Sequence, residues 1–210
     1  MRRLLSVLLV LLFTASVQAA DMRELFLSMP DSILPLLTKN NRLDMLDFID
    51  SNMKATVRNR LDRESELISI DRNSFSLAYT ANSDIEVRLF YYRDSIPVIC
   101  MIHTVKAPVC DSRIRFFDTG WNAVDGSRLI AEPTLDDFVL KGTGVSRELT
   151  GKFLNASEMR TIKAGFTQNM ECIEFCYTGI EFLETDEFAA CIRPEPLRYV
   201  WNGKRFVPVR

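Results

Sequence analysis

This sequence has little histidine, no long apolar run after its first 20 residues and no excess of basic residues. His103 is the one histidine among 210 residues, so a zinc site built from several imidazoles lacks its ligands. The 26 basic residues are outnumbered by 28 acidic ones, which disfavours nucleic acid and anionic membrane surfaces as partners. Beyond the first 20 residues, no apolar run approaches the roughly 20 residues of a membrane-spanning helix. We therefore expect no nucleic-acid partner and no membrane span in the mature chain.

Residues 1–19 have the three parts of a secretory signal peptide. Arg2 and Arg3 supply the positive start, residues 4–13 are apolar apart from one serine, and Val17 and Ala19 fit a cleavage site. Ten residues make about 15 Å of helix against roughly 30 Å of hydrocarbon, so a membrane anchor is disfavoured. Cleavage leaves 24 basic and 28 acidic residues, a net charge of −4. We expect a soluble protein in the periplasm or outside the cell.

Residues 20–210 are predicted to form a single α+β domain. Apolar residues make up 47% of the chain, which is enough for a sizeable core. Helical periodicity at the mature start gives way to period-two alternation, which predicts N-terminal helices packed on an antiparallel sheet. Glycine and proline interrupt residues 118–155, where a short helix is expected from Thr134. This stretch is the expected seam if the chain forms two lobes.

Two helices are expected before the sheet. Asp21 can cap a helix over residues 22–28 that Pro30 stops, and Asn41 can cap a second helix. Apolar side chains recur in this second helix at spacings of three and four residues, which is typical of a buried face. The residues of this expected face are Leu43, Met45, Leu46, Phe48 and Ile49.

Five strands without intervening helices are predicted between residues 66 and 117. Their apolar residues alternate with polar ones or, after Pro97, run continuously as in a strand covered on both faces. Turn residues separate the strands, so an antiparallel meander is expected. The predicted strands are residues 66–70, 75–80, 85–92, 98–105 and 112–117.

The last third is predicted to add β-hairpins and one short helix. Alternation over residues 162–166 and 173–177 predicts one hairpin, and residues 185–192 are predicted to be helical. Asn202–Gly203 lies between two alternating runs, which predicts a type I′ turn with positive φ at both residues. Pro208 suits an edge strand because it lacks a backbone N–H group.

The odd number of cysteines leaves at least one thiol unpaired. The five are Cys100, Cys110, Cys172, Cys176 and Cys191. Cys100 and Cys110 flank a predicted turn and could be bridged only through a bulge or a shifted register. Cys172 and Cys176 would lie roughly 13 Å apart along one strand, which is too far for a disulfide. Most of the five are expected to be small buried hydrophobes.

No residue is assigned here to catalysis, to a cofactor or to a metal. His103 lies in an apolar strand and is interpreted as a packed side chain, although with Cys100 or Cys110 it could form the nucleophile–base pair of a thiol hydrolase. The acids at every third position over residues 44–50 indicate a solvated helix face rather than a metal site.

Three weaker patterns have ordinary explanations. Gly142–Thr143–Gly144 resembles part of a phosphate loop but lacks the lysine that should follow, and Asn155–Ala156–Ser157 matches a glycosylation acceptor that is common by chance. Aromatic residues at 90–92 and 116–117 place rings on both faces of their strands. A sheet buried on both faces is favoured over an exposed binding surface.

Three segments resemble an uncharacterised family of exported proteins from the Bacteroides group, known as a domain of unknown function. They are MPDSILPLLTKNNRLDMLDFID, HTVKAPVCDSRIRFFDTGW and EPLRYVWNGKRFVPV, and the resemblance extends over residues 21–209. It implies a shared architecture and a location in a Gram-negative envelope or outside the cell. The resemblance transfers no catalytic or binding residue.

Two hypotheses of function follow. The first is a non-enzymatic secreted or periplasmic binding module for an envelope protein or a peptide, suggested by sheet edges and aromatic side chains. The alternative is a hydrolase-like enzyme that uses His103 with a cysteine or a carboxylate.

Overall fold

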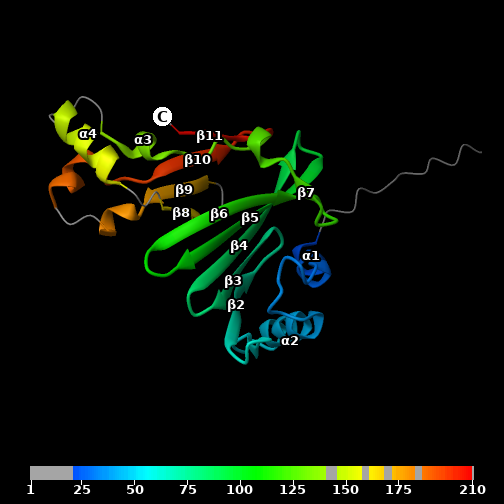
Figure 1. The fold of residues 1–210 in the computed structure, drawn as a ribbon. Helices are drawn as coiled ribbons and strands as arrows, with labels where there is room; N and C mark the ends of the chain where they lie inside the picture. Colours follow the sequence, from blue (N-terminus) through cyan, green and yellow to red (C-terminus); the bar gives the residue numbers. More distant parts are fainter. Residues whose placement is uncertain (1–20, 141–145, 158–160, 168–171, 183–185, 210) are drawn as a thin grey trace, which may run out of the picture.

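The computed structural model describes residues 21–140, 146–157, 161–167, 172–182 and 186–209, so the predicted signal peptide lies outside the described residues. These residues form two antiparallel sheets and four α-helices, which confirms the predicted α+β class. The helices are α1 (Met22–Ser28), α2 (Lys39–Asp50), α3 (Leu135–Phe138) and α4 (Arg147–Ala156). Figure 1 shows α1 and α2 on one side of the larger sheet and the smaller sheet on the other.

The larger sheet is a meander in which each strand pairs with the next one along the chain. This order confirms the predicted meander of five strands and adds a short strand at each end. The strands are β1 (Thr56–Arg58), β2 (Glu64–Ile70), β3 (Ser74–Thr80), β4 (Ser83–Tyr92), β5 (Ile96–Lys106), β6 (Cys110–Phe117) and β7 (Ala123–Val124). The two-residue β7 and the three-residue β1 are too short to show an alternating pattern.

The N-terminal helices cover one face of this sheet. Asp21 caps α1 as predicted, by accepting a hydrogen bond from the backbone of Arg23. The predicted cap of α2 was wrong by three residues: Thr38 is the cap, and its hydroxyl accepts the N–H of Asn41 at 3.1 Å. The side chain of Asn41 in turn accepts the N–H of Thr38, so the two polar residues cap each other.

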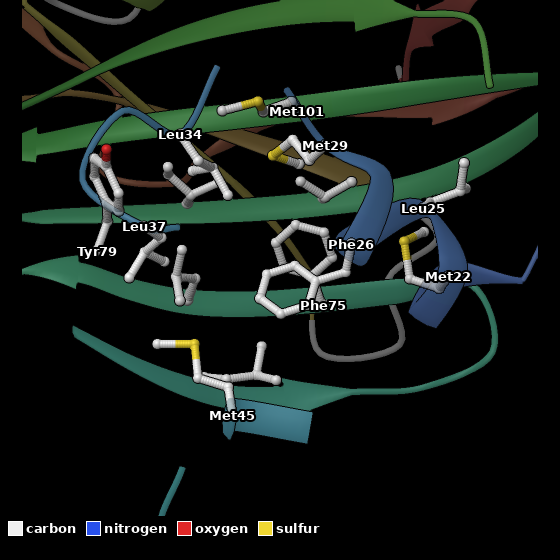
Figure 2. Close-up of a cluster of buried hydrophobic side chains, with 14 of the residues drawn as sticks. Met22, Leu25, Phe26, Met29, Leu34, Leu37, Met45, Phe75, Tyr79 and Met101 are labelled. Atoms are coloured by element: carbon white, nitrogen blue, oxygen red, sulfur yellow. The ribbon is translucent and has the colours of Figure 1, made fainter. Parts of the chain in front are cut away.

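The N-terminal core lies between these helices and the larger sheet. Figure 2 shows Phe26 against Phe75, whose ring centroids are 4.9 Å apart, and Met101 in the same buried cluster as Leu34. Leu43 was predicted to lie on the buried face of α2, but 40% of its surface is exposed. Arg42 points inward instead, because the segment that joins the two helices offers carbonyl groups to it.

Arg42 pins this connecting segment to α2. Only 2% of its surface is exposed, and its guanidinium donates to the carbonyl oxygens of Leu37 and Met29, both at 2.8 Å. Asp31 lies 3.7 Å away and supplies a negative charge. A buried cation is tolerated here because backbone oxygens replace the water that it loses.

The smaller sheet contains the two hairpins predicted for the last third of the chain. Its order is β11-β10-β9-β8, and its strands are β8 (Ile162–Phe166), β9 (Cys172–Tyr177), β10 (Leu197–Trp201) and β11 (Phe206–Pro208). Ala164 lies opposite Phe175, and Phe166 lies opposite Ile173, which confirms the pairing predicted from alternation. Pro208 is in an edge strand, as expected.

The predicted type I′ turn at the last hairpin was wrong. Trp201 pairs with Phe206, so four residues form the loop, and only Gly203 among them has a positive φ, of 83°. The side chain of Asn202 accepts the N–H groups of Lys204 and Arg205 at 3.0 and 2.9 Å. The asparagine therefore acts through its side chain rather than through its backbone conformation.

The described residues between β7 and β8 connect the two sheets. The short helix expected from Thr134 is α3, where Thr134 and Asp137 form a capping box, whereas α4 was not predicted. The helix predicted for residues 185–192 is a 3₁₀ helix at Asp186–Cys191, with residue 185 outside the described ranges. Two further 3₁₀ helices lie at Gly126–Arg128 and Gly179–Phe182.

A second core lies between the two sheets and is rich in aromatic rings. Phe90 of β4 contacts Phe166, Trp201 and Phe206 of the smaller sheet, with centroid distances of 6.0, 5.3 and 4.9 Å. Phe116 packs in the same core, while Phe117 belongs to the N-terminal core. The larger sheet is thus buried on both faces where its aromatic residues lie, as predicted.

Replacing Arg42 by methionine should lower the free energy of unfolding by about 2–6 kcal/mol. Two buried carbonyl oxygens would lose their donor, and each unsatisfied group costs about 1–3 kcal/mol. Urea unfolding would measure the change. Arg58→Met is the matched control, because the ion pair of Arg58 with Asp62 is exposed and should contribute less than about 1 kcal/mol. Equal losses in the two variants would contradict the pinning role.

Candidate functional site

The edge of the smaller sheet meets the face of the larger one. On the side of β8 away from β9, alternate backbone N–H groups of Ile162, Ala164 and Phe166 have no strand to pair with. Side chains of the larger sheet accept these bonds instead: Asp111 at 3.1 Å, Ser112 at 2.9 Å and Glu86 at 3.3 Å. Three capped donors fix β8 against the larger sheet and close its edge.

A groove lies in the corner between the two sheets. Its volume is about 480 Å³, and its floor is formed by short side chains of the larger sheet, such as Ser76 and Ala78, beside Ile68. Gly165 and Phe166 of β8 form one wall, and the outward side of β9 continues it. Figure 1 shows β8 and β9 of the smaller sheet beside β6 and β5 of the larger one. Pockets of this size are typical of ligand sites.

The groove contains charges of both signs, and most of them are paired. Lys106 binds Asp84 at 2.9 Å, and Arg198 binds Glu174 at 2.7 Å. Among the described residues, no ion pair is formed by the two remaining charged groups of the lining, Glu86 and Lys163. One carboxyl group and one amine are therefore available to a ligand.

Glu86 is the most perturbed acid of the groove. Burial raises the pKa of its carboxyl group, and the nearby carboxylate of Asp84 raises it further. The N–H group of Phe166 and the charge of Lys163 act in the opposite direction. Gly165 allows this close approach, since a Cβ atom there would lie 3.3 Å from Oε2 of Glu86.

The cysteines differ from the sequence-based expectation. Cys100 and Cys191 are buried, but Cys110 and Cys172 are half-buried and Cys176 is exposed, so the expectation that most are buried was wrong. Burial raises the pKa of the Cys100 thiol well above its usual range, which makes it a poor nucleophile. Cys110 and Cys176 line the groove.

None of the five cysteines is in a disulfide. Cys110 lies opposite Lys106 in the strand register, while Cys100 lies opposite Phe116. The two thiols are thus separated by about 20 Å along β5, at roughly 3.3 Å per residue. A bulge or a shifted register cannot close that gap, so the bridge between Cys100 and Cys110 is excluded by geometry.

His103 lies on the face of β5 that is turned away from the groove. Its ring packs edge-on against Tyr79, with centroids 6.0 Å apart, as a packed histidine was expected to do. Burial and the neighbouring Arg115 lower the pKa of His103. Cys100 and Cys110 lie on the opposite face of the sheet, so the structure does not bring either of these cysteines together with His103.

The other sequence patterns do not come together in a site among the described residues. The glycine pair at residues 142 and 144 lies outside the described ranges. Ser157 of the glycosylation-like triplet is buried and donates to the carbonyl oxygen of Phe153 at 2.8 Å. Over the described residues, no group of three or more potential ligands is arranged to hold a metal ion. The acids at residues 44 and 47 are exposed, and Asp50 binds Arg23.

The sheet edges that suggested a binding role are short or partly covered. Asn41 of α2 donates to the carbonyl oxygen of Arg58 at the edge of β1, and β7 has only two residues. At the edge of β11, Phe206 donates to the carbonyl oxygen of Leu129 at 2.7 Å. Together with the capped β8, these contacts favour the groove over strand addition as the surface suited to a ligand.

The architecture is that of an α+β protein with two stacked antiparallel sheets, and similar proteins share it. Residues 14–206 match the family described as "Protein of unknown function (DUF3256)", and the chain belongs to this family. A solved structure of a domain of an uncharacterized protein from Porphyromonas gingivalis W83 is 26% identical, with a TM-score of 0.78. The match covers 91% of this chain and 98% of that one. No curated protein matches significantly.

The match confirms the family resemblance and adds no functional residue. It also agrees with the Bacteroides-group character of the three segments, because Porphyromonas gingivalis is the source of the similar structure. In the parts of the chain that the structure describes, no helix is both long and apolar enough for a bilayer span.

Removing the hydroxyl group of Ser112 should loosen β8. Ser112→Ala leaves the N–H group of the buried Ala164 without an acceptor, at a cost of about 1–3 kcal/mol. Urea unfolding and hydrogen exchange at the amide of Ala164 would measure the effect. Ser69→Ala, at an exposed position of β2, should change stability by less than about 0.5 kcal/mol. Unchanged exchange at Ala164 would refute the capping role.

Stability should depend on pH through Glu86. Because its folded-state pKa is raised, the folded protein binds a proton here that the unfolded chain releases at about pH 4.3. The stabilisation is complete below that pH and is lost as pH rises through the folded-state pKa. Glu86→Gln should therefore become more stable relative to the wild type as the pH rises from about 4 towards neutrality. Thermal unfolding of both proteins across this range tests it, and a constant difference in Tm would contradict it.

Proposed function

We propose that this protein is an exported, non-enzymatic binding module that takes a peptide segment of another envelope protein into the groove between its sheets. The signal peptide predicted over residues 1–19 supports the exported location.

The groove is the observation that carries the proposal. It offers one carboxyl group and one amine that no ion pair neutralises within the described residues, Glu86 and Lys163. A peptide carries both signs of charge in its termini and side chains, whereas nucleic acids carry only negative charge. The apolar surface of Ile68 and Phe166 can contact side chains of the bound segment.

Blocking the groove should abolish binding without unfolding the protein. Ala78 lies in the floor, so Ala78→Arg would fill the space that the peptide needs. The measurement is the retention, on immobilised protein, of a peptide pool made by cleaving Porphyromonas gingivalis envelope proteins after arginine. We expect the variant to retain at least tenfold less peptide than the wild type.

Ala123→Arg is the matched control, because Ala123 is exposed on β7 and remote from the groove lining. Circular dichroism would verify that both variants are folded. Equal retention by the wild type and by folded Ala78→Arg would show that the groove does not bind peptides.

A further inference from the structure

Glu86 has one carboxyl oxygen engaged and one available. Its Oε2 atom accepts the backbone N–H of Phe166 at 3.3 Å, and the carboxyl group lines the groove beside Gly165. No other donor to Glu86 is found among the described residues, and the lining around it consists largely of short or apolar side chains such as Ala78 and Phe166.

The other carboxylates of the groove are already neutralised. Asp84 is held by Lys106, and Glu174 is held by Arg198 in a 2.7 Å contact across neighbouring strands. Lys163 is exposed on the wall and forms no ion pair with Glu86. Among the described residues of the lining, Glu86 is therefore the carboxylate without an ion pair that a positive group entering the groove would meet.

Partial burial makes ionisation of the Glu86 carboxyl group energetically unfavourable while no counter-ion is bound to it. Desolvation opposes its ionisation, as the raised pKa indicates, and a cation from the ligand would compensate for the lost water. Charge-assisted hydrogen bonds are about twice as strong as neutral ones, so such a contact can decide which ligands bind.

We propose that Glu86 is the specificity-determining residue of the groove and binds a primary ammonium group of the peptide ligand, supplied by its N-terminus or by a lysine side chain. This inference rests on the proposed function of the groove. A guanidinium group suits the site less well, because its fork pairs with both oxygens of a carboxylate and Oε2 is engaged by Phe166. An ammonium group needs only the remaining oxygen.

The test uses the same arginine-cleaved envelope peptides in three forms. One pool is unmodified, a second has its lysines acetylated before cleavage, and a third has every primary amine acetylated after cleavage. Each peptide keeps its arginine in all three pools. We expect acetylation of all amines to reduce retention by the wild type at least tenfold, and the second pool distinguishes the two sources of the ammonium group.

Glu86→Gln supplies the second arm. Glutamine has the same shape and can still accept the N–H of Phe166, so the variant should fold, and it should bind the unmodified pool at least tenfold more weakly than the wild type. Acetylation should make no further difference to it. Glu148→Gln is the matched control, because Glu148 lies on α4 outside the groove lining and its carboxylate is paired with Lys152 at 2.8 Å, so its loss should leave retention unchanged.

The outcomes separate the two proposals. If the wild type retains the unmodified and fully acetylated pools equally while Ala78→Arg retains neither, the groove binds peptides but Glu86 does not select an amine. Equal losses in Glu86→Gln and Glu148→Gln would also overturn the role of Glu86. If Ala78→Arg retains peptides as well as the wild type does, the proposed function itself fails.

Discussion

A strand at the edge of a sheet leaves every second backbone N–H group without a strand partner, and β8 is such a strand. In this fold, side chains that project from the larger sheet accept those donors, so the edge of one sheet is bound to the face of the other. Ser112 does this most completely, since its hydroxyl group accepts from Ala164 and also reaches the carbonyl oxygen of the same residue at 3.2 Å. The outward face of β9 is left open by this arrangement and becomes a wall of the groove.

Local patterns predicted the strands well, because the residues that determine a strand are neighbours in the sequence. Alternation identified five strands of the meander, and it aligned Ala164 with Phe175 because a hairpin fixes its register locally. The errors arose where two residues compete for one role. Thr38 and Asn41 are both good caps, and Arg42 replaces Leu43 in the core because carbonyl oxygens from an adjacent segment bind it.

The groove was not predictable from the sequence. Its lining comes from β2 to β6 and from β8 and β9, segments that are up to about a hundred residues apart, and none of them carries a recognisable motif. Ser76 and Ala78 are ordinary polar-side positions of an alternating strand, and Glu86 is one of 28 acids. What distinguishes Glu86 is that β8 closes over it, which depends on the docking of the second sheet. The exposure of the cysteine side chains was unpredictable for the same reason. Cys176 is exposed because one face of β9 is uncovered.

Glu86 serves both the fold and the proposed site, and this couples them. Its Oε2 atom holds the backbone of Phe166, while its other oxygen is available to a ligand. A ligand cation favours the ionised carboxylate, and an ionised acceptor forms a stronger hydrogen bond to a backbone N–H than a neutral one. Binding of an ammonium group would therefore tighten the attachment of β8 at the same time. The groove and the contact between the sheets would be stabilised together, since one side chain contributes to both.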